Sequence, residues 1–218
     1  MTQETPITFG LPKGRNFADV IKFIKNAGYD LPDIDKKGRQ LIYFSHCKRL
    51  RLVILRDTDI PTYIEHGAVD IAVAGKDMLM EQDKDLYEPV DLGFGYCRIA
   101  VAGPKDSLEK YQKSSSITVA TKFMHITEEF FRQKGINTEL IKLHGTQELA
   151  PLIGLADYIV DLVSTGTTLK ENGLVELEQI GEITARLVVN RASLKIRHKT
   201  ILPIIESMKA DVEKLGKI

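Results

Sequence analysis

The chain has 218 residues, 43% of them hydrophobic, so it is long enough to bury one or two substantial cores. Lys plus Arg and Asp plus Glu number 30 each, and this balance gives no reason to expect nucleic acid or an acidic membrane as a partner, so any anion binding must come from local basic clusters. No apolar run approaches a membrane span and Met1 to Thr8 does not resemble a secretion signal, so we expect a cytoplasmic protein.

Short apolar strands alternate with helical segments along the chain, which predicts an α/β fold. We expect strands at Ile7–Leu11, Leu41–Phe44, Leu52–Leu55, Ile71–Val73, Tyr96–Ala102, Ile117–Ala120, Thr138–Lys142, Tyr158–Val163 and Ala185–Val189. We expect helices at Asn16–Ala27, Ile60–His66, Lys76–Glu81, Ile126–Lys134, Gln147–Gly154 and Lys199–Lys214. Gly103 and Pro104 should end the strand before them, and a polar connection should follow from Lys105 to Ser116.

The first candidate site is the LPKGR segment that follows the first predicted strand. Pro12 and Gly14 favour a turn, while Lys13 and Arg15 place two cations just before a predicted helix. The spacing is not that of a P-loop. From these residues alone, a turn with solvated charges and a turn that binds an anion are equally good interpretations.

The most informative segment comes later, where a buried strand leads into a hydroxyl-rich turn and a short helix. The strand Tyr158–Val163 is apolar except for Asp161, which lies near its carboxyl end, where ligands bind in open α/β sheets. The short helix Leu169–Asn172 is closed by Gly173. Unpaired backbone N–H groups at a helix start can hold a phosphate, and four hydroxyls around one glycine exceed what a cap needs. An ordinary capped connection without a ligand is the alternative.

The cysteines and histidines suggest little chemistry. Cys47 and Cys97 are far apart and form no CxxC pattern, so we expect two free thiols rather than a disulfide. His46 beside Cys47 offers two possible metal ligands, whereas zinc sites need three or four. We therefore expect no metal site built from protein side chains.

Four segments resemble, in the same order, the motifs of the ATP phosphoribosyltransferase family, the first enzyme of histidine biosynthesis. They are LPKGR at Leu11–Arg15, LRDTDIPTYIEHGAVDIAVAGKD at Leu55–Asp77, ELAPLIGLADYIVDLVSTGTTLKENGLVE at Glu148–Glu176, and RLVVN at Arg186–Asn190. The resemblance covers nearly the whole chain. Because the chain ends soon after its last predicted helix, it resembles the short form, which lacks a C-terminal regulatory domain.

The resemblance implies a two-lobed fold like that of periplasmic binding proteins, with the active site in a cleft between the lobes. The first lobe would comprise residues 1–92 and 182–218. The second lobe, residues 93–181, would carry the loop that binds phosphoribosyl pyrophosphate (PRPP). The return of the chain to the first lobe is implied by the resemblance and not by the sequence pattern.

The resemblance also assigns candidate site residues. Those expected at PRPP are Glu148, Asp161, Ser164, Thr165, Gly166, Thr167, Thr168 and Leu169. Those expected at ATP are Leu11, Lys13, Gly14, Asp70, Ala74, Gly75 and Lys76. Arg15 and Arg39 would be catalytic, stabilising the departing pyrophosphate. The alternatives are that Glu148 is a surface helix residue, that Asp161 caps a turn, and that Arg39 belongs to a solvated basic turn with Lys36 and Lys37.

The implied reaction is transfer of the phosphoribosyl group from PRPP to N1 of ATP, with release of pyrophosphate. Mg²⁺ would be held mainly by the substrate. The implied partners are a histidyl-tRNA-synthetase-like regulatory subunit and a second catalytic subunit in a homodimer, with no nucleic acid and no membrane. Two alternatives remain: a two-lobed module that binds a phosphorylated small molecule without catalysis, and a transferase that uses another base.

Overall fold

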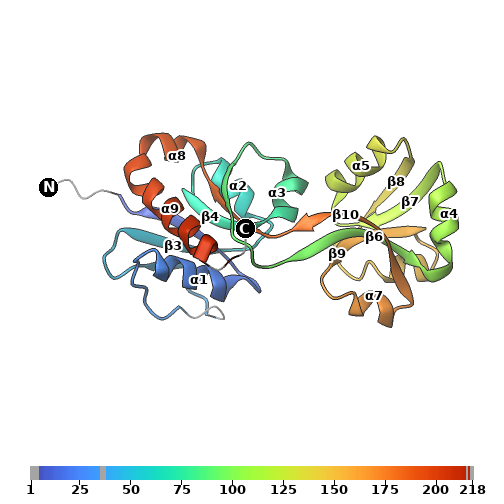
Figure 1. Cartoon of the computed structure of the whole chain (residues 1–218), viewed down its shortest axis with the longest axis horizontal. Coiled ribbons are helices and arrows are strands. Elements are labelled where there is room, and N and C mark those ends of the chain that lie inside the picture. Colours follow the sequence, from blue (N-terminus) through green and yellow to red (C-terminus); the bar gives the residue numbers. More distant parts are fainter. Residues whose placement is uncertain (1–4, 35–37, 215, 217–218) are drawn as a thin grey trace. The chain divides into compact units, whose positions relative to one another are not determined.

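The computed structural model describes residues 5–34, 38–214 and 216 (Figure 1). Lys36 and Lys37, which the sequence groups with Arg39, lie outside the described residues. The chain forms two compact units. Unit 1 contains the chain up to Gly95 and from Thr184 onward, and unit 2 contains Tyr96–Ile183. The chain therefore leaves unit 1 once and returns to it.

Unit 1 is built on a six-stranded mixed sheet with the order β2-β3-β1-β4-β11-β5. Its strands are β1 (Ile7–Pro12), β2 (Ile42–Phe44), β3 (Leu50–Leu55), β4 (Ile71–Gly75), β5 (Tyr87–Asp91) and β11 (Ala185–Val189). Strand β1 is parallel to β3 and β4, whereas β2 and β11 run antiparallel to their neighbours. Because β1, β3 and β4 point the same way, their carboxyl ends share one edge of the sheet.

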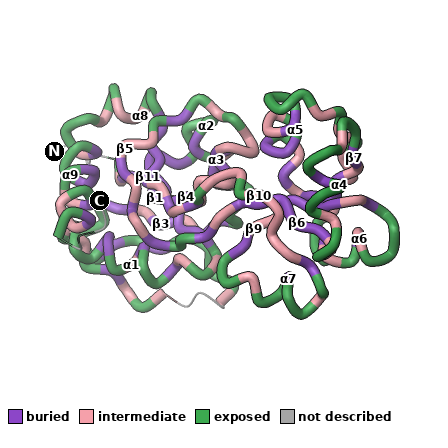
Figure 2. The backbone as a smooth tube through the Cα atoms, turned by 45° about the vertical axis from the view of Figure 1, so that its right-hand side comes forward, coloured by how far each residue is buried: buried purple, intermediate pink, exposed green. Residues whose placement is uncertain are grey.

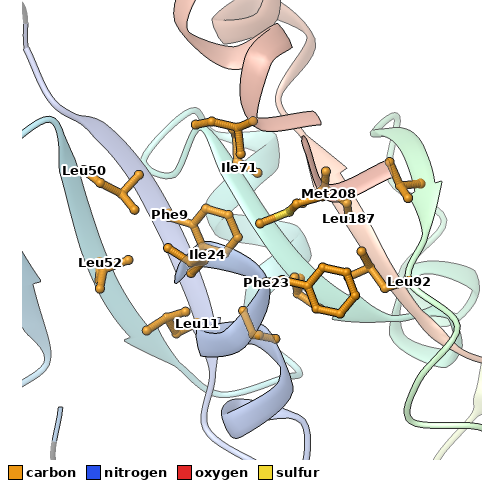
Figure 3. Packing of buried hydrophobic residues seen from close by; sticks show 14 of the residues in the cluster. Phe9, Leu11, Phe23, Ile24, Leu50, Leu52, Ile71, Leu92, Leu187 and Met208 are labelled. Carbon is orange, nitrogen blue, oxygen red and sulfur yellow. The ribbon is translucent and has the colours of Figure 1, made fainter. Parts of the chain in front are cut away.

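Helices cover both faces of this sheet. The helices of unit 1 are α1 (Phe17–Asn26), α2 (Ile60–Glu65), α3 (Lys76–Gln82), α8 (Arg191–Ile196) and α9 (His198–Lys214). Figure 3 shows Phe23 and Ile24 of α1 and Met208 of α9 packed on Phe9 and Leu187 of the sheet. Residues of α2 and α3 pack on the other face with residues of β4. Buried residues concentrate on the strands and exposed residues on the outer helix surfaces (Figure 2).

Two local sequence features explain details of this unit. Strand β1 is buried at every position. A Cβ atom at Gly10 would lie 2.9 Å from the Cβ of Ala72, so glycine allows β1 and β4 to approach closely. Asn190 caps α8 by accepting a hydrogen bond from the Ser193 N–H at 2.7 Å.

Unit 2 has a five-stranded mixed sheet with the order β10-β6-β9-β7-β8. Its strands are β6 (Cys97–Pro104), β7 (Ser116–Thr121), β8 (Asn137–Lys142), β9 (Tyr158–Val163) and β10 (Leu174–Ile183). Its helices are the 3-10 turn η1 (Lys105–Ser107) and α4 (Leu108–Lys113), α5 (Met124–Gln133), α6 (Leu149–Leu152) and α7 (Thr167–Glu171). Strands β7, β8 and β9 are mutually parallel, so their carboxyl ends also share an edge.

The α/β prediction is confirmed, but the sequence analysis missed two strands. Strand β5 was missed because it contains Pro89, which is tolerated here because β5 lies at the sheet edge. Strand β10 was missed because irregular register at Glu176–Glu178 and Gln179–Gly181 breaks the period-two alternation of its side chains.

Several predicted segments differ in length or type. The polar connection after Lys105 contains the short helix α4, and β6 continues through Pro104 instead of stopping at Ala102. Helix α8 was also missed, since six residues are too few to show a helical period. Helix α6 is shorter than the predicted Gln147–Gly154, and α7 begins two residues before the predicted Leu169.

Candidate active site

The carboxyl edge of the unit 1 sheet gathers most of the residues that the sequence singles out in this unit. Lys13 and Arg15 follow β1 and are exposed. The turn is fixed by its backbone, because the Lys13 N–H donates to the Leu55 carbonyl at 2.7 Å and the Gly14 N–H donates to the Pro12 carbonyl at 3.0 Å. Two cations are thereby held beside the ends of β1 and β3.

Two carboxylates lie against glycines at the same edge. A Cβ at Gly14 would be 3.0 Å from Asp57 Oδ2, and a Cβ at Gly75 would be 2.2 Å from Asp77 Oδ1. Desolvation raises the pKa of Asp57 although its side chain still reaches solvent; the nearby Asp77 raises that pKa further, and Arg15 lowers it. The charges of the basic turn and of this acidic pair therefore influence one another.

Arg39 reaches this edge through strand register. Strand β2 is antiparallel to β3, with Ile42 opposite Val53, and the Ile54 N–H donates to the Leu41 carbonyl at 2.9 Å. Arg39 precedes β2 by three residues, so it lies beside the carboxyl end of β3, and it is exposed. The structure thus brings Arg39 to the sheet edge that carries Arg15.

The end of β4 contributes backbone more than side chains. Ala74 is buried, and Lys76 forms an ion pair with Glu88 at 2.9 Å. The side chain of Leu11 is fully buried in the core, so only its backbone is available to a ligand. Strand ends of this kind present backbone groups to small molecules at the carboxyl edge of a sheet.

Asp70 lies at the opposite end of β4, so the structure does not bring it to the other residues expected at ATP. Its side chain is 7% exposed. Its Oδ2 atom accepts hydrogen bonds from the Thr8 N–H at 2.8 Å and from Arg197 Nη1 at 2.9 Å. These contacts give Asp70 a structural role between the start of β1 and the junction of α8 and α9.

In unit 2, the turn between β9 and α7 has the geometry of an open anion cradle. Gly166 adopts a left-handed conformation, with φ of 76°, immediately before α7. Among the described residues other than its two chain neighbours, one heavy atom, Val163 Cγ1, lies within 4 Å of a Cβ built at Gly166, at 3.8 Å. The hydroxyls of Thr165 and Thr167 are 2.9 Å apart and exposed. Exposed hydroxyls therefore surround a position where backbone can approach a ligand closely.

The remaining residues expected at PRPP differ in their exposure. Ser164 and Thr168 are exposed, whereas Leu169 is 6% exposed and anchors α7 in the core of unit 2. The side chain of Leu169 therefore positions the turn, and only its backbone is available to a ligand.

Arg98, which the sequence analysis did not single out, holds this turn. Its guanidinium contacts both carboxylate oxygens of Glu176 at 2.9 and 2.7 Å and donates to the Ser164 carbonyl at 3.3 Å. The link joins β6, β10 and the first residue after β9. No local pattern could have revealed it, because the residues are 78 and 66 positions apart along the chain.

The two acids expected at the ribose both lie near the carboxyl ends of the parallel strands of unit 2. Asp161 is half-buried on β9, and its Oδ1 atom accepts a hydrogen bond from the Leu162 N–H at 2.8 Å. Lys122 Nζ lies 3.9 Å from that oxygen, which places a further cation at the end of β7. Glu148 is half-buried just before α6, in the connection that follows the carboxyl end of β8. Lys122 is a second candidate that sequence reasoning missed.

Within the residues that the structure describes, no group of three or more His, Cys, Asp or Glu side chains could hold a metal ion. Cys47 is exposed and Cys97 is buried, and neither forms a disulfide. No described helix has the length and apolar character needed to span a membrane.

Comparison with known proteins identifies the family to which this arrangement belongs. Residues 56–210 match the family model described as ATP phosphoribosyltransferase. A protein of that name from Citrifermentans bemidjiense is 50% identical over 208 residues, covering 94% of this chain and 98% of the relative. Another from Syntrophotalea carbinolica is 51% identical over 204 residues, covering 93% of each. The chain belongs to the ATP phosphoribosyltransferase family.

This membership confirms the resemblance found in the sequence and makes the chain an enzyme of the first step of histidine biosynthesis. The reaction transfers the phosphoribosyl group of PRPP to ATP and releases pyrophosphate. A binding module without catalysis is not favoured, since the relatives match over almost the whole of their own length.

Solved structures agree with the family and with the two-lobed fold. The chain matches a subunit of the "ATP phosphoribosyl transferase (HisG:HisZ) complex from Thermotoga maritima" with a TM-score of 0.81 and 31% identity, covering 95% of this chain and 99% of that one. The substrate-binding protein of an amino acid ABC transporter matches with a TM-score of 0.58 at 16% identity, which shows the fold alone. The expected periplasmic-binding-protein-like α/β fold is thus confirmed.

Proposed function

We propose that the turn between β9 and α7 binds the 5′-phosphate of PRPP. The observation that carries this proposal is the left-handed Gly166 in a turn whose neighbouring hydroxyls are exposed. Ser164, Thr165, Thr167 and Thr168 supply hydroxyl donors, and the backbone N–H groups at the start of α7 supply further donors to a dianion.

Glu148 and Asp161 would accept hydrogen bonds from the ribose hydroxyls of the donor. A carboxylate accepts two hydroxyl hydrogen bonds well, and its charge stabilises the positive charge that develops on the sugar ring as the leaving group departs. Lys122 Nζ lies 3.9 Å from Asp161 Oδ1 and would place a positive charge beside the ribose site. Arg98 would act as a positioning residue, because it fixes the turn through the Ser164 carbonyl.

ATP would bind at the carboxyl edge of the unit 1 sheet. The backbone of Leu11, Gly14 and the Ala74–Gly75–Lys76 segment lies at this edge, and Lys13 provides a cation for the triphosphate. Asp70 is the exception among the residues expected here, since its carboxylate is occupied by Thr8 and Arg197 at the other end of β4.

The chemistry requires positioning and charge stabilisation and no covalent intermediate. Adenine N1 attacks the anomeric carbon while the bond from that carbon to the pyrophosphate oxygen breaks, so negative charge accumulates on the departing pyrophosphate. Arg15 and Arg39 are exposed at one sheet edge and would stabilise this charge. Mg²⁺, when bound to the substrate, would neutralise pyrophosphate oxygens.

The proposed setting is cytoplasmic, and the proposed assembly is a catalytic homodimer with a histidyl-tRNA-synthetase-like regulatory subunit. The likeness to a subunit of the HisG:HisZ complex supports a heteromeric partner. Adding such a subunit should raise the rate of product formation, and an unchanged rate would count against this part of the proposal.

The proposed roles can be tested with ATP, PRPP and Mg²⁺ by following pyrophosphate release and formation of phosphoribosyl-ATP. Arg15→Ala should lower kcat about 100-fold or more, the loss typical for one group that stabilises transition-state charge. Folding stability should change little because Arg15 is exposed. Lys22→Ala, an exposed charge on α1, is the matched control and should retain full activity. Equal kinetics for both variants would contradict the role of Arg15.

A further inference from the structure

A second basic site lies at the amino edge of the unit 1 sheet, away from the ends of β1 and β3 that carry the substrate candidates. A surface cavity of about 430 Å³ opens between the residue before β3 and the junction of α8 and α9. Arg49, Arg197, His198 and Lys199 line it together with Thr5 and Thr200. The proposed reaction uses none of these residues.

The lining is strongly biased in charge. Three of its side chains are permanent cations and His198 adds a ring N–H, while the described lining contains no carboxylate. The whole chain is balanced at 30 basic and 30 acidic residues, so this local excess does not simply reflect a basic protein. A concave surface lined by one sign of charge concentrates ions of the opposite sign.

Arg197 is held in place before any ligand arrives. Its Nη1 atom contacts Asp70 Oδ2 at 2.9 Å, and its Nη2 atom donates to the Thr5 carbonyl. Asp70 is buried and is itself fixed by the Thr8 N–H. Because these contacts restrict the guanidinium, an incoming anion loses less conformational entropy in ordering it.

Arg49 is also oriented, since its guanidinium lies 6.0 Å from the centre of the Tyr29 ring. Asp70 offsets one positive charge of the cavity, and the Cys47 thiol, whose pKa is lowered to about 7, lies beside Arg49, so the three basic side chains Arg49, Arg197 and Lys199 leave an excess of positive charge. An excess of positive charge and two guanidinium groups suit a phosphate dianion, whose oxygens accept N–H donors. The volume is that of a site for one small molecule and not of an extended nucleic-acid groove.

We propose that this cavity binds the phosphate group of a small anion, separately from both substrates. The ligand is either inorganic phosphate or a phosphate monoester, which share this chemistry. The proposal does not depend on the roles assigned to Arg15 or to the β9–α7 turn.

The test uses the full chain, labelled with ¹⁵N, and follows backbone amide signals while inorganic phosphate or ribose 5-phosphate is added at constant ionic strength. Saturable shifts are expected at Arg49 and at residues 197–201, apart from any shifts at residues 164–169 caused by binding in the substrate turn. A tighter dissociation constant for ribose 5-phosphate than for phosphate at these amides would identify a monoester as the ligand, and equal values would identify free phosphate.

The variant Arg49→Gln/Lys199→Gln should raise the dissociation constant at these amides about tenfold or more, because two charged donors are lost. The control Lys22→Gln/Lys25→Gln removes two exposed charges on α1 and should bind as the unmodified chain does. Both variants should retain phosphoribosyltransferase activity. Shifts at residues 197–201 that do not saturate, or that both double variants share, would overturn the proposal even if the proposed function holds.

Discussion

Gly166→Ala is the sharpest test of the proposed phosphate turn, because a second left-handed glycine at the other end of α7 provides a matched control. Gly166 precedes α7 with φ of 76°, and Gly173 follows α7 with φ of 69°. Placing a residue with a Cβ in this left-handed region costs about 1–2 kcal/mol. Both glycines have room for the added methyl. In the part of the chain that the structure describes, and apart from the chain neighbours, a Cβ at Gly166 meets Val163 Cγ1 at 3.8 Å and a Cβ at Gly173 meets no heavy atom within 4 Å.

The two variants should therefore have similar stability and different kinetics. For a chain of this length, a loss of about 1–2 kcal/mol lowers the unfolding midpoint by roughly 2–8 °C. In Gly166→Ala the added methyl also occupies the space where the 5′-phosphate of PRPP would approach the backbone. Loss of a hydrogen bond to a charged group is worth about 1.5–3 kcal/mol, so the KM for PRPP should rise about tenfold or more.

The measurement is the initial rate of pyrophosphate release as PRPP is varied at saturating ATP, together with a thermal unfolding scan of each variant. Gly173→Ala should lower the midpoint similarly and leave the KM for PRPP within about twofold. If Gly166→Ala also leaves that KM unchanged, the phosphate does not lie against this backbone. If both variants raise it equally, strain in α7 and not contact with the ligand explains the effect.

Three further predictions concern Arg98, Cys47 and Asp70. Arg98→Ala should raise the KM for PRPP about three- to tenfold by releasing the Ser164 carbonyl, and an unchanged KM would remove its positioning role. A hydrogen bond with Ser45, together with smaller contributions from Arg49, lowers the pKa of Cys47 to about 7, so the rate of Cys47 alkylation should rise through pH 7. Ser45→Ala should move that midpoint upward, and no movement would contradict the cause. Asp70→Asn should lower the free energy of unfolding, measured with denaturant, by about 2–3 kcal/mol without changing the KM for ATP. Weaker ATP binding at unchanged stability would instead make Asp70 a ligand.

The sequence predicted the parts of the fold that depend on local pattern. Strand β9 and the turn after it were predicted from a continuous apolar run followed by hydroxyls and glycine, and the observed bounds of β9 are those expected. Strand β10 was not predictable in the same way, because its register irregularities place Glu176 and Glu178 in different surroundings. Glu176 contacts Arg98, and Glu178 accepts a hydrogen bond from Tyr111 at 2.5 Å. Such an irregularity interrupts the alternation of side chains between the two faces of the strand, which is the pattern that predicts a strand from sequence.

Long-range contacts account for the part of the candidate site that sequence reasoning missed. Arg98 lies within an apolar strand, and nothing near it indicates a partner 78 residues away. Asp57 lies in a segment that the family resemblance covers, but its closeness to Gly14 depends on the pairing of β1 with β3. Such residues become candidates only when the order and direction of the strands are known.

The parallel strands of unit 1 have basic residues near both of their ends. At their carboxyl ends, Arg15 and Arg39 are exposed, and we propose that they stabilise the departing pyrophosphate. At their amino ends, Arg197 is fixed by Asp70, a buried acid that keeps part of its charge neutralised. A guanidinium that is already fixed suits binding of an anion, because ordering it on binding costs little conformational entropy. The proposed catalytic cations and the proposed phosphate cavity therefore lie at opposite ends of the same strands.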